Sequence, residues 1–250
     1  VAPALAGIFP NPPEKLNGAL RDLGFAAVYE VAAGADETAR REAVEWAERN
    51  EAGEPFLATS CCPAWVQTVK RHLPAFAAHL SHTPSPMRLT AEMARAEDPE
   101  AVLVFIGPCA AKRMEAVDAG LPHHVLTAEE LGAMFIAREI DVDACEDLLP
   151  SRRGSPRGFG FAVSGGVASA VAAQRPEGPA PTLHAVNGLS TKMIKILAAY
   201  AKTGKAPGNL LEVMCCEGGC VAGPCSFEDP ARATSRLRQR AVDLPGNRSL

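Results

Sequence analysis

The feature of this sequence that most limits its fold is the position of its cysteines. Cys62, Cys109 and Cys216 each follow a short apolar run, at the point where the next element begins. A continuous apolar run indicates a strand buried on both faces, and such strands alternating with helices are typical of parallel sheets. Ligands bind at the carboxyl ends of strands in such sheets, so these three turns are candidate ligand-binding positions.

The alternation of apolar runs and helical patterns extends along most of the chain. Apolar runs predict strands at 25–31, 56–59, 101–106, 184–187 and 210–214. Helices are expected at 13–23, 36–50, from Pro63 onward, 110–116, 127–138, from the glycine turn at 164–166 to Gln174, and 191–202. Segment 151–160 is expected to be a loop, and the Arg-rich tail after Pro230 a surface helix with a loose end. The fold class is therefore α/β, with two lobes of mostly parallel sheets flanked by helices.

A chain of 250 residues can form one sizeable domain or two small lobes around a shared cleft. We expect one domain over 1–230, followed by a C-terminal tail over 231–250. Within the domain, residues 1–105 together with 210–225 are expected to form one lobe, and 106–209 the other.

Composition excludes several classes of protein. Hydrophobic residues make up 47% of the chain and aromatics only 5%, so the core is expected to consist mainly of Ala, Val and Leu. The net charge is −4 and no Lys/Arg run is long enough to indicate nucleic acid binding. No apolar run approaches the roughly 20 residues of a membrane span, so no membrane association is expected. Because the first residue is Val rather than Met, we expect a fragment that lacks its true N-terminus.

Eight cysteines are many for an ordinary cytoplasmic enzyme. Two adjacent pairs, Cys61–Cys62 and Cys215–Cys216, are poorly placed for a disulfide within each pair, and a secreted disulfide scaffold is usually shorter. Grouped cysteines at strand-to-helix turns indicate a reduced, metal-binding, cytoplasmic protein. Thiolates select iron–sulfur clusters, zinc or Cu(I). A structural zinc site remains the alternative, although zinc sites usually draw on close cysteine pairs in loops, and the chain has no Cys-x-x-Cys pair.

Three segments carry the grouped cysteines: 59–65 (TSCCPAW), 107–115 (GPCAAKRME) and 212–220 (EVMCCEGGC). In a helical turn Cys216 and Cys220 would face the same way. The two glycines between them remove side chains where a bulky cofactor needs close approach.

In their order and separations, these segments resemble the three signature motifs of the cluster-binding domain of FeFe hydrogenases. Further matches are Ala2-Pro3-Ala4, Ser81 with Ser85-Pro86, 164–167 and Asn187-Gly188, so the resemblance extends to about Cys225. It implies an H-cluster in the cleft between the lobes. This cofactor is a 4Fe–4S cluster joined to a di-iron subsite that carries CO, cyanide and a dithiolate bridge.

The resemblance also implies the ligands. Cys62, Cys109, Cys216 and Cys220 would bind the 4Fe–4S cluster, and Cys220 would bridge to the di-iron subsite. Lys112 matches a lysine that hydrogen-bonds a cyanide, and the alternative is a solvated helix lysine. The residues expected to line the cofactor pocket are Ala2, Pro3, Ser85, Met87, Gly107, Pro108 and Met214.

Proton transfer is implied for a further set of residues. Cys61 matches the cysteine that faces the dithiolate bridge, and the alternative is a buried, inert thiol. Beyond it, Glu42, Ser81 and Glu45 are similar to the family's proton relay, which must cross protein to reach water. The helix of Glu45 is charged along its length, so a solvated position for Glu45 is equally compatible with the sequence.

Some residues depart from the catalytic members of the family. Gly107 stands where those members have a Met, and Met87 where they have a Gln that can hydrogen-bond a diatomic ligand. Cys215 replaces a small residue, while Cys145 and Cys225 are additional thiols with a structural role by default. These changes resemble divergent and sensory subgroups.

Three functions follow from these features. The first is a ferredoxin-type FeFe hydrogenase that interconverts hydrogen with protons and electrons. The second is a hydrogen sensor that uses the same cluster with slow turnover. The third is a non-hydrogenase iron–sulfur assembly relative, and retention of both Cys61 and Lys112 argues against it. The implied partners are a ferredoxin or ferredoxin-like domain for electron transfer, and maturation proteins.

Overall fold

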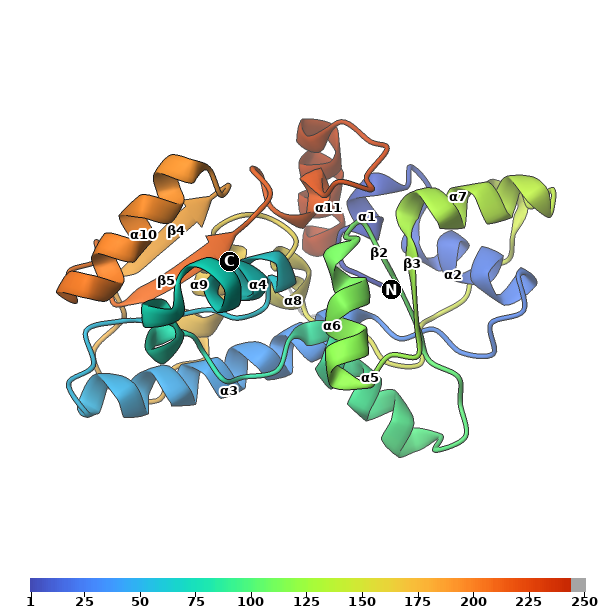
Figure 1. The fold of residues 1–250 in the computed structure, drawn as a ribbon. Helices are drawn as coiled ribbons and strands as arrows, with labels where there is room; N and C mark the ends of the chain where they lie inside the picture. The colour runs from blue at the N-terminus through green and yellow to red at the C-terminus, as the bar shows by residue number, and fades with distance from the viewer. Residues whose placement is uncertain (244–250) are drawn as a thin grey trace.

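Two small parallel sheets flanked by helices organise the chain in the computed structural model, which describes residues 1–243 (Figure 1). The helices are α1 (Leu5–Ile8), α2 (Pro13–Asp22), α3 (Val31–Glu51), α4 (Pro63–His72), α5 (Pro86–Glu97), α6 (Ala111–Ala119), α7 (Ala128–Ala137), α8 (Pro156–Gly160), α9 (Gly166–Ala173), α10 (Thr191–Thr203) and α11 (Pro230–Asp243). The strands are β1 (Leu57–Ala58), β2 (Val104–Gly107), β3 (His124–Thr127), β4 (Leu183–Asn187) and β5 (Leu210–Met214). Short 3-10 turns are η1 (Pro74–His79), η2 (Val142–Ala144) and η3 (Cys220–Ala222). The α/β class expected from the sequence is confirmed.

The larger sheet has the order β1-β5-β4, with all strands parallel. Strand β5 lies at its centre and is buried along its whole length, which explains its continuous apolar character. Leu210 and Met214 pack with α3 and α9 on one face, while Leu211 and Val213 pack with α4 and α10 on the other. Figure 1 shows these helices around β4 and β5, with α3 running beneath them.

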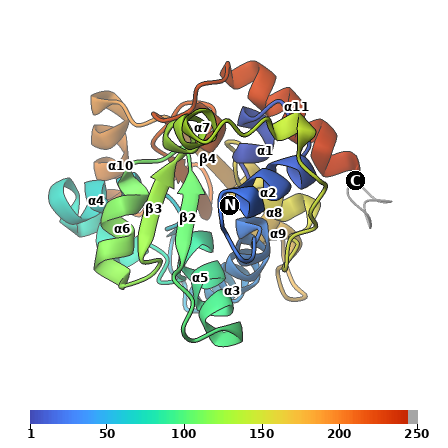
Figure 2. The same ribbon diagram turned by 90° about the vertical axis from the view of Figure 1, so that its right-hand side faces the viewer.

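The smaller sheet consists of β2 and β3 in parallel, with Val104 opposite His124 and Gly107 opposite Thr127. The start of the chain runs beside the free edge of β2, where the Ala2 amide donates to the Ile106 carbonyl over 2.8 Å. Figure 2 shows β2 and β3 side by side, with the N-terminus next to β2. Helices α1, α2, α7 and α11 share the apolar core behind this sheet.

Several predicted element boundaries are wrong. Segment 25–31 is not a strand, because its only β contact in the described chain is an isolated bridge from Tyr29 to Arg152, and α3 already begins at Val31. The strand expected from 101 begins at Val104. Segment 151–160 is not entirely loop, since Ser155 caps a short helix, α8, by accepting a hydrogen bond from the Gly158 amide.

The sheets also divide the chain differently from the expected lobes. Strand β4 lies within 106–209 but pairs with β5, so that segment contributes to both sheets. The expected tail begins within α11, whose Ala233 and Leu237 are buried against α1 in the core. Residues 244–250 of that tail lie outside the described residues. Within residues 1–243, no helix combines the length and apolar character needed to cross a membrane.

Candidate cluster-binding site

The four predicted ligand cysteines lie around one pocket, because each follows the carboxyl end of a parallel strand. Cys62 comes after β1 as the N-cap of α4, and Cys109 follows β2. Cys216 follows β5, and Cys220 begins η3. All four line the same pocket, which takes residues from both sheets. Strand ends that are distant in sequence thus converge on one site, as parallel topology predicts.

The local backbone holds these thiols in place. At Cys62, Pro63 occupies the first helical turn, where its missing N–H leaves no hydrogen bond unmade. Gly219 has a φ of +93°, and a Cβ there would lie 2.7 Å from the Ser164 nitrogen, so a larger residue would displace the loop that carries Cys216 and Cys220. The glycine at 219 is therefore required by the tight packing of this loop.

Burial and mutual proximity disfavour the thiolate forms of the pocket cysteines. Burial raises the pKa of Cys216 to about 11, and nearby thiols add to the shift. Burial and the neighbouring thiols likewise raise the pKa of Cys220. Burial also raises the pKa of Cys62, although backbone amides of Cys215 and Trp65 oppose the shift. Four thiolates would be costly in this pocket without a cation, and iron would offset that cost, so the residues fit a metal cluster.

The spacing of the thiols bears on which metal group fits. Among residues 1–243, no three His, Cys, Asp or Glu side chains are close enough to hold a single metal ion. A zinc site needs its ligands within about 2.3 Å of one centre, whereas a polynuclear cluster spreads its ligands around a larger body.

Lys112 places an ammonium inside the pocket. The side chain is buried, and its Nζ donates to Glu115 Oε2 over 2.7 Å and to the Cys61 carbonyl and Ser85 Oγ over 3.3 Å each. Burial lowers the pKa of Lys112, but the Glu115 carboxylate outweighs burial and raises it overall. Lys112 is thus a charged donor within the pocket and not a solvated helix lysine.

Sequence reasoning missed Glu115, which contacts two predicted site residues at once. Its carboxylate pairs with Lys112 and also accepts a hydrogen bond from the Ser85 hydroxyl. The i, i+3 spacing of Lys112 and Glu115 on α6 is the signal that could have identified the pair.

The expected pocket residues separate into two groups. Those that line the pocket are Ala2, Pro3, Met87, Pro108 and Met214. Ser85 and Gly107 are not among the lining residues, and Ser85 acts on the pocket through Lys112. A Cβ at Gly107 would lie within 2.9 Å of the Phe105 ring and the Ala2 Cβ. Phe105, which the sequence did not identify, thus occupies the space beside Gly107 and itself lines the pocket.

The predicted proton-transfer residues begin with two buried groups. Cys61 is buried, and burial followed by the Glu42 charge raises its pKa well above the usual value. Glu42 is fully buried, and its Oε1 accepts a hydrogen bond of 3.2 Å from the Ser60 amide. Its Oε2 has no hydrogen-bond partner among the described residues. Burial raises the pKa of Glu42 to about 7, although Ser60 and Ser81 oppose the shift.

Ser81 connects Glu42 to Glu45. The Ser81 hydroxyl donates to Glu45 Oε2 over 2.7 Å and lies near enough to Glu42 to affect its pKa. A hydroxyl has one proton, so Ser81 can donate to one of the two carboxylates at a time. Within this set the hydrogen bond from Ser81 to Glu45 is formed, while Glu42 lies near enough to Cys61 and Ser81 for its charge to raise the pKa of Cys61 and for Ser81 to oppose the rise in its own.

Glu45 is held by several donors and is not a solvated carboxylate. Its side chain is 17% exposed, and Arg49 Nη2 donates to Oε1 over 2.8 Å. The Thr83 hydroxyl donates to Oε2 over 3.0 Å. Burial raises the pKa of Glu45, but hydrogen bonds from the His82 amide, Ser81 and Thr83 outweigh it, so the pKa is lowered overall.

The other cysteines differ in position. All eight cysteines are free thiols. Cys215, to which the sequence analysis assigned no role, lines the pocket beside the four predicted ligand cysteines. Cys145 lies in the core behind the smaller sheet, and the Cys225 amide donates to the Pro108 carbonyl over 3.1 Å.

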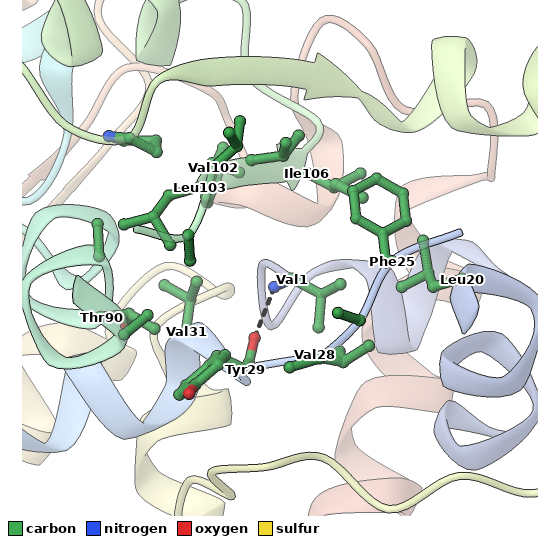
Figure 3. Close-up of a pocket in the computed structure, with 18 of the residues that line it drawn as sticks. Val1, Leu20, Phe25, Val28, Tyr29, Val31, Thr90, Val102, Leu103 and Ile106 are labelled. Atoms are coloured by element: carbon green, nitrogen blue, oxygen red, sulfur yellow. Dashed lines mark hydrogen bonds between the residues drawn. The ribbon is translucent and has the colours of Figure 1, made fainter. Parts of the chain in front are cut away.

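A second cavity, of about 500 Å³, lies between β2, α5 and segment 24–29 (Figure 3). Its wall is mostly apolar and contains no cysteine. At its edge the Val1 ammonium donates to the Tyr29 carbonyl over 2.7 Å, shown as the dashed line in Figure 3.

Comparison with protein families gives one match, over residues 1–224, to the family described as "Iron only hydrogenase large subunit, C-terminal domain". Similar curated proteins include iron hydrogenase 1 of Clostridium pasteurianum, 28% identical over 84% of the chain. Another is the periplasmic [Fe] hydrogenase large subunit of Nitratidesulfovibrio vulgaris, 30% identical over 89% of the chain. The chain spans 44% of the length of the first and 66% of the second.

Solved structures agree with the fold. A variant of [FeFe]-hydrogenase HydA1 from Chlamydomonas reinhardtii superposes with a TM-score of 0.72 at 24% identity. The match covers the whole chain and 84% of the algal chain. A second structure, titled for stepwise H-cluster assembly in HydA, superposes with a TM-score of 0.72 at 21% identity over the same shares of both chains. At these identities the superpositions establish the arrangement of sheets and helices.

Proposed function

Because the chain belongs to the iron-only hydrogenase family, where it matches the C-terminal domain of the large chain, we propose that it holds an H-cluster and interconverts hydrogen with protons and electrons. The observation that carries the proposal is the convergence of four cysteines, a buried lysine and the buried Cys61 thiol on one pocket. A structural metal site would need the cysteines but neither of the other two features.

The four thiolates of Cys62, Cys109, Cys216 and Cys220 would hold the 4Fe–4S cluster, with Cys220 shared with the di-iron subsite. When bound, this group supplies the redox centre where hydrogen is formed or split. The chain contributes a dry pocket, since Met87 and Met214 are each 2% exposed and exclude water from its wall.

Lys112 would bind the cyanide of the di-iron subsite. Its ammonium is already held at the pocket wall by Glu115 and the Cys61 carbonyl, so little side-chain freedom is lost when an anion binds. A charged donor in a water-excluding site forms a stronger hydrogen bond than the same donor in water.

Proton movement would follow the series of contacts from the pocket to the surface. The Cys61 thiol exchanges a proton with the Glu42 carboxylate, and the proton then passes through the Ser81 hydroxyl to Glu45. The pKa of Glu42, raised to about 7 by burial, suits a group that both accepts and releases protons near neutral pH.

A hydrogen sensor on the same site is the second candidate function. Phe105 fills the space beside Gly107, and Met87 presents a thioether where a Gln would offer an amide donor. Both changes remove contacts to the di-iron subsite that the resemblance implies for catalytic members. They favour slow turnover without affecting the four ligand cysteines.

Electron transfer is proposed to involve a ferredoxin or a ferredoxin-like domain, and cluster insertion to involve maturation proteins. A cytoplasmic location is proposed because all eight cysteines are free, as is usual in a reducing compartment. The curated relative named as periplasmic makes cell fractionation the direct test of that location.

Infrared spectroscopy of the matured chain tests the central proposal. CO and cyanide stretching bands are expected, because neither ligand occurs in a simple iron–sulfur or zinc protein. Normal iron content without these bands would instead indicate the iron–sulfur assembly relative. With the bands present, the rate of hydrogen evolution separates an enzyme from a slow sensor.

A further inference from the structure

A histidine stands at the outer end of the proposed proton series. The His82 backbone amide donates to Glu45 Oε1 over 3.0 Å, and its ring Nδ1 lies 3.7 Å from the same oxygen. The His82 side chain is 83% exposed, whereas that of Glu45 is 17% exposed. A largely exposed imidazole therefore lies beside the mostly buried carboxylate of Glu45.

We propose that His82 carries protons between bulk solvent and Glu45. The inference rests on the proposed function, since it concerns the supply of protons to that site. Imidazole is the side chain best suited to this step, because it both gains and loses a proton near neutral pH. Its two ring nitrogens allow it to take a proton on one side and release one on the other.

The step balances with an ordinary buffer as the proton donor. A buffer acid transfers its proton to one ring nitrogen of neutral His82, which becomes an imidazolium. The other ring nitrogen then releases its proton to the Glu45 carboxylate, which leaves His82 neutral and Glu45 protonated. One water, or a small rotation of the exposed ring, bridges the 3.7 Å separation. Hydrogen oxidation runs the same transfers in reverse.

The charged groups around His82 hold it beside Glu45. Arg49 Nη2 lies 3.2 Å from the His82 Nδ1 and donates to Glu45 Oε1 over 2.8 Å, so one guanidinium contacts both ends of the transfer. The same guanidinium pairs with Glu54 through its other nitrogen. Glu54 partly neutralises the charge of Arg49, and Arg49 holds the Glu45 carboxylate and the His82 ring next to each other.

The neighbouring histidine does not offer the same route. The ring of His79 lies 4.2 Å from that of Phe56 and 6.0 Å from that of Phe76 between centroids, and its Nδ1 is buried without a hydrogen-bond partner among the described residues. His79 is thus a packing residue, whereas the His82 ring is free to meet buffer molecules.

The experiment uses the matured full chain and measures isotope exchange between H2 and D2O, which a slow sensor also catalyses. At low concentrations of a bulky buffer, His82→Ala should lose about tenfold in rate, less than the roughly 100- to 10,000-fold of acid–base groups because water can partly replace a surface residue. Added imidazole should restore the rate of the variant and leave that of the wild type unchanged. His72→Ala, at another exposed histidine, is the matched control and should behave as wild type.

Two readouts independent of turnover keep the result interpretable. The CO and cyanide bands should be at the wild-type positions in His82→Ala, and the cluster-free variant should unfold at the wild-type temperature. An unchanged exchange rate at low buffer overturns the proposal, and so does a loss that imidazole fails to restore. Absence of the bands from the wild type would instead refute the proposed function.

Discussion

The ionisation of Glu42 offers the most direct physical test of the proton series, because it can be measured without any cluster. Glu42 is fully buried, and burial raises its pKa from 4.5 to about 7. In the unfolded chain the carboxyl group ionises near its usual value. Between the two values the folded state therefore holds a proton that the unfolded state has lost, and the free energy of unfolding falls as pH rises.

The size of this effect follows from the shift. Each pKa unit corresponds to about 1.4 kcal/mol, so a shift of roughly 2.5 units lowers the free energy of unfolding by about 3 kcal/mol. The stability is fully present below the unfolded value, falls across the interval up to about pH 7, and then levels off. Glu42→Gln removes the titrating group and should abolish this contribution.

The measurement is urea unfolding of the reduced, cluster-free chain at pH 5 and pH 8, for wild type and Glu42→Gln. From pH 5 to pH 8 the wild type should lose roughly 2–3 kcal/mol more stability than the variant. Glu45→Gln is the matched control on the same helix. The pKa of Glu45 is lowered because its hydrogen bonds outweigh burial, so its contribution is lost only as pH falls below the usual carboxyl value, and Glu45→Gln should keep the wild-type change between pH 5 and pH 8. If wild type and Glu42→Gln have the same pH dependence, Glu42 ionises as an ordinary surface carboxylate and the proposed relay lacks its central group.

Three further predictions concern the cluster itself. Cys109→Ala should lose the 4Fe–4S cluster and the di-iron subsite together, as measured by iron content, whereas Cys145→Ala, in the core behind the smaller sheet, should retain both. Lys112→Ala should lose much of the di-iron subsite but keep the 4Fe–4S cluster, because the proposed hydrogen bond would reach cyanide and not sulfide; unshifted cyanide bands at full occupancy would contradict this role. Cys61→Ala should keep the CO and cyanide bands while hydrogen evolution falls by about 100- to 10,000-fold, the range of acid–base relays. Lost bands in that variant would make Cys61 a ligand or a packing residue.

Local sequence was sufficient for the ligand positions. A continuous apolar strand followed by a cysteine at the next turn is a pattern of a few neighbouring residues, and it occurs at Cys62, Cys109 and Cys216. Parallel pairing then brings the ends of β1 and β5 together, whereas β2 belongs to the other sheet and its end reaches the same pocket through the packing of the two sheets. The capping box of Thr127 and Glu130, both halves of which are formed, is local in the same way because its two residues are three positions apart.

Local patterns fail where the outcome depends on a distant partner. Segment 25–31 has strand composition, but a strand forms only when a neighbour supplies a hydrogen-bonding edge, and here a cavity separates most of the segment from β2. The Arg-rich helix α11 has the composition of a surface element, yet Arg236 donates to the carbonyl of Gly7 and Leu237 is buried in the core. In both cases the conformation or burial of the segment depends on contacts with distant parts of the chain, which composition does not reveal.

The sequence by itself determined the fold class and the placing of Cys62, Cys109 and Cys216 at strand ends, because each depends on residues close together in the chain. Only the tertiary structure decided the environment of the carboxylates. Glu42 and Glu45 are on one helix, but their pKa values shift in opposite directions because Glu42 faces the buried Cys61 while Glu45 meets the donors of segment 81–83. Those donors are more than thirty residues away in the chain, and burial and hydrogen bonding at that range exist only once the chain has folded.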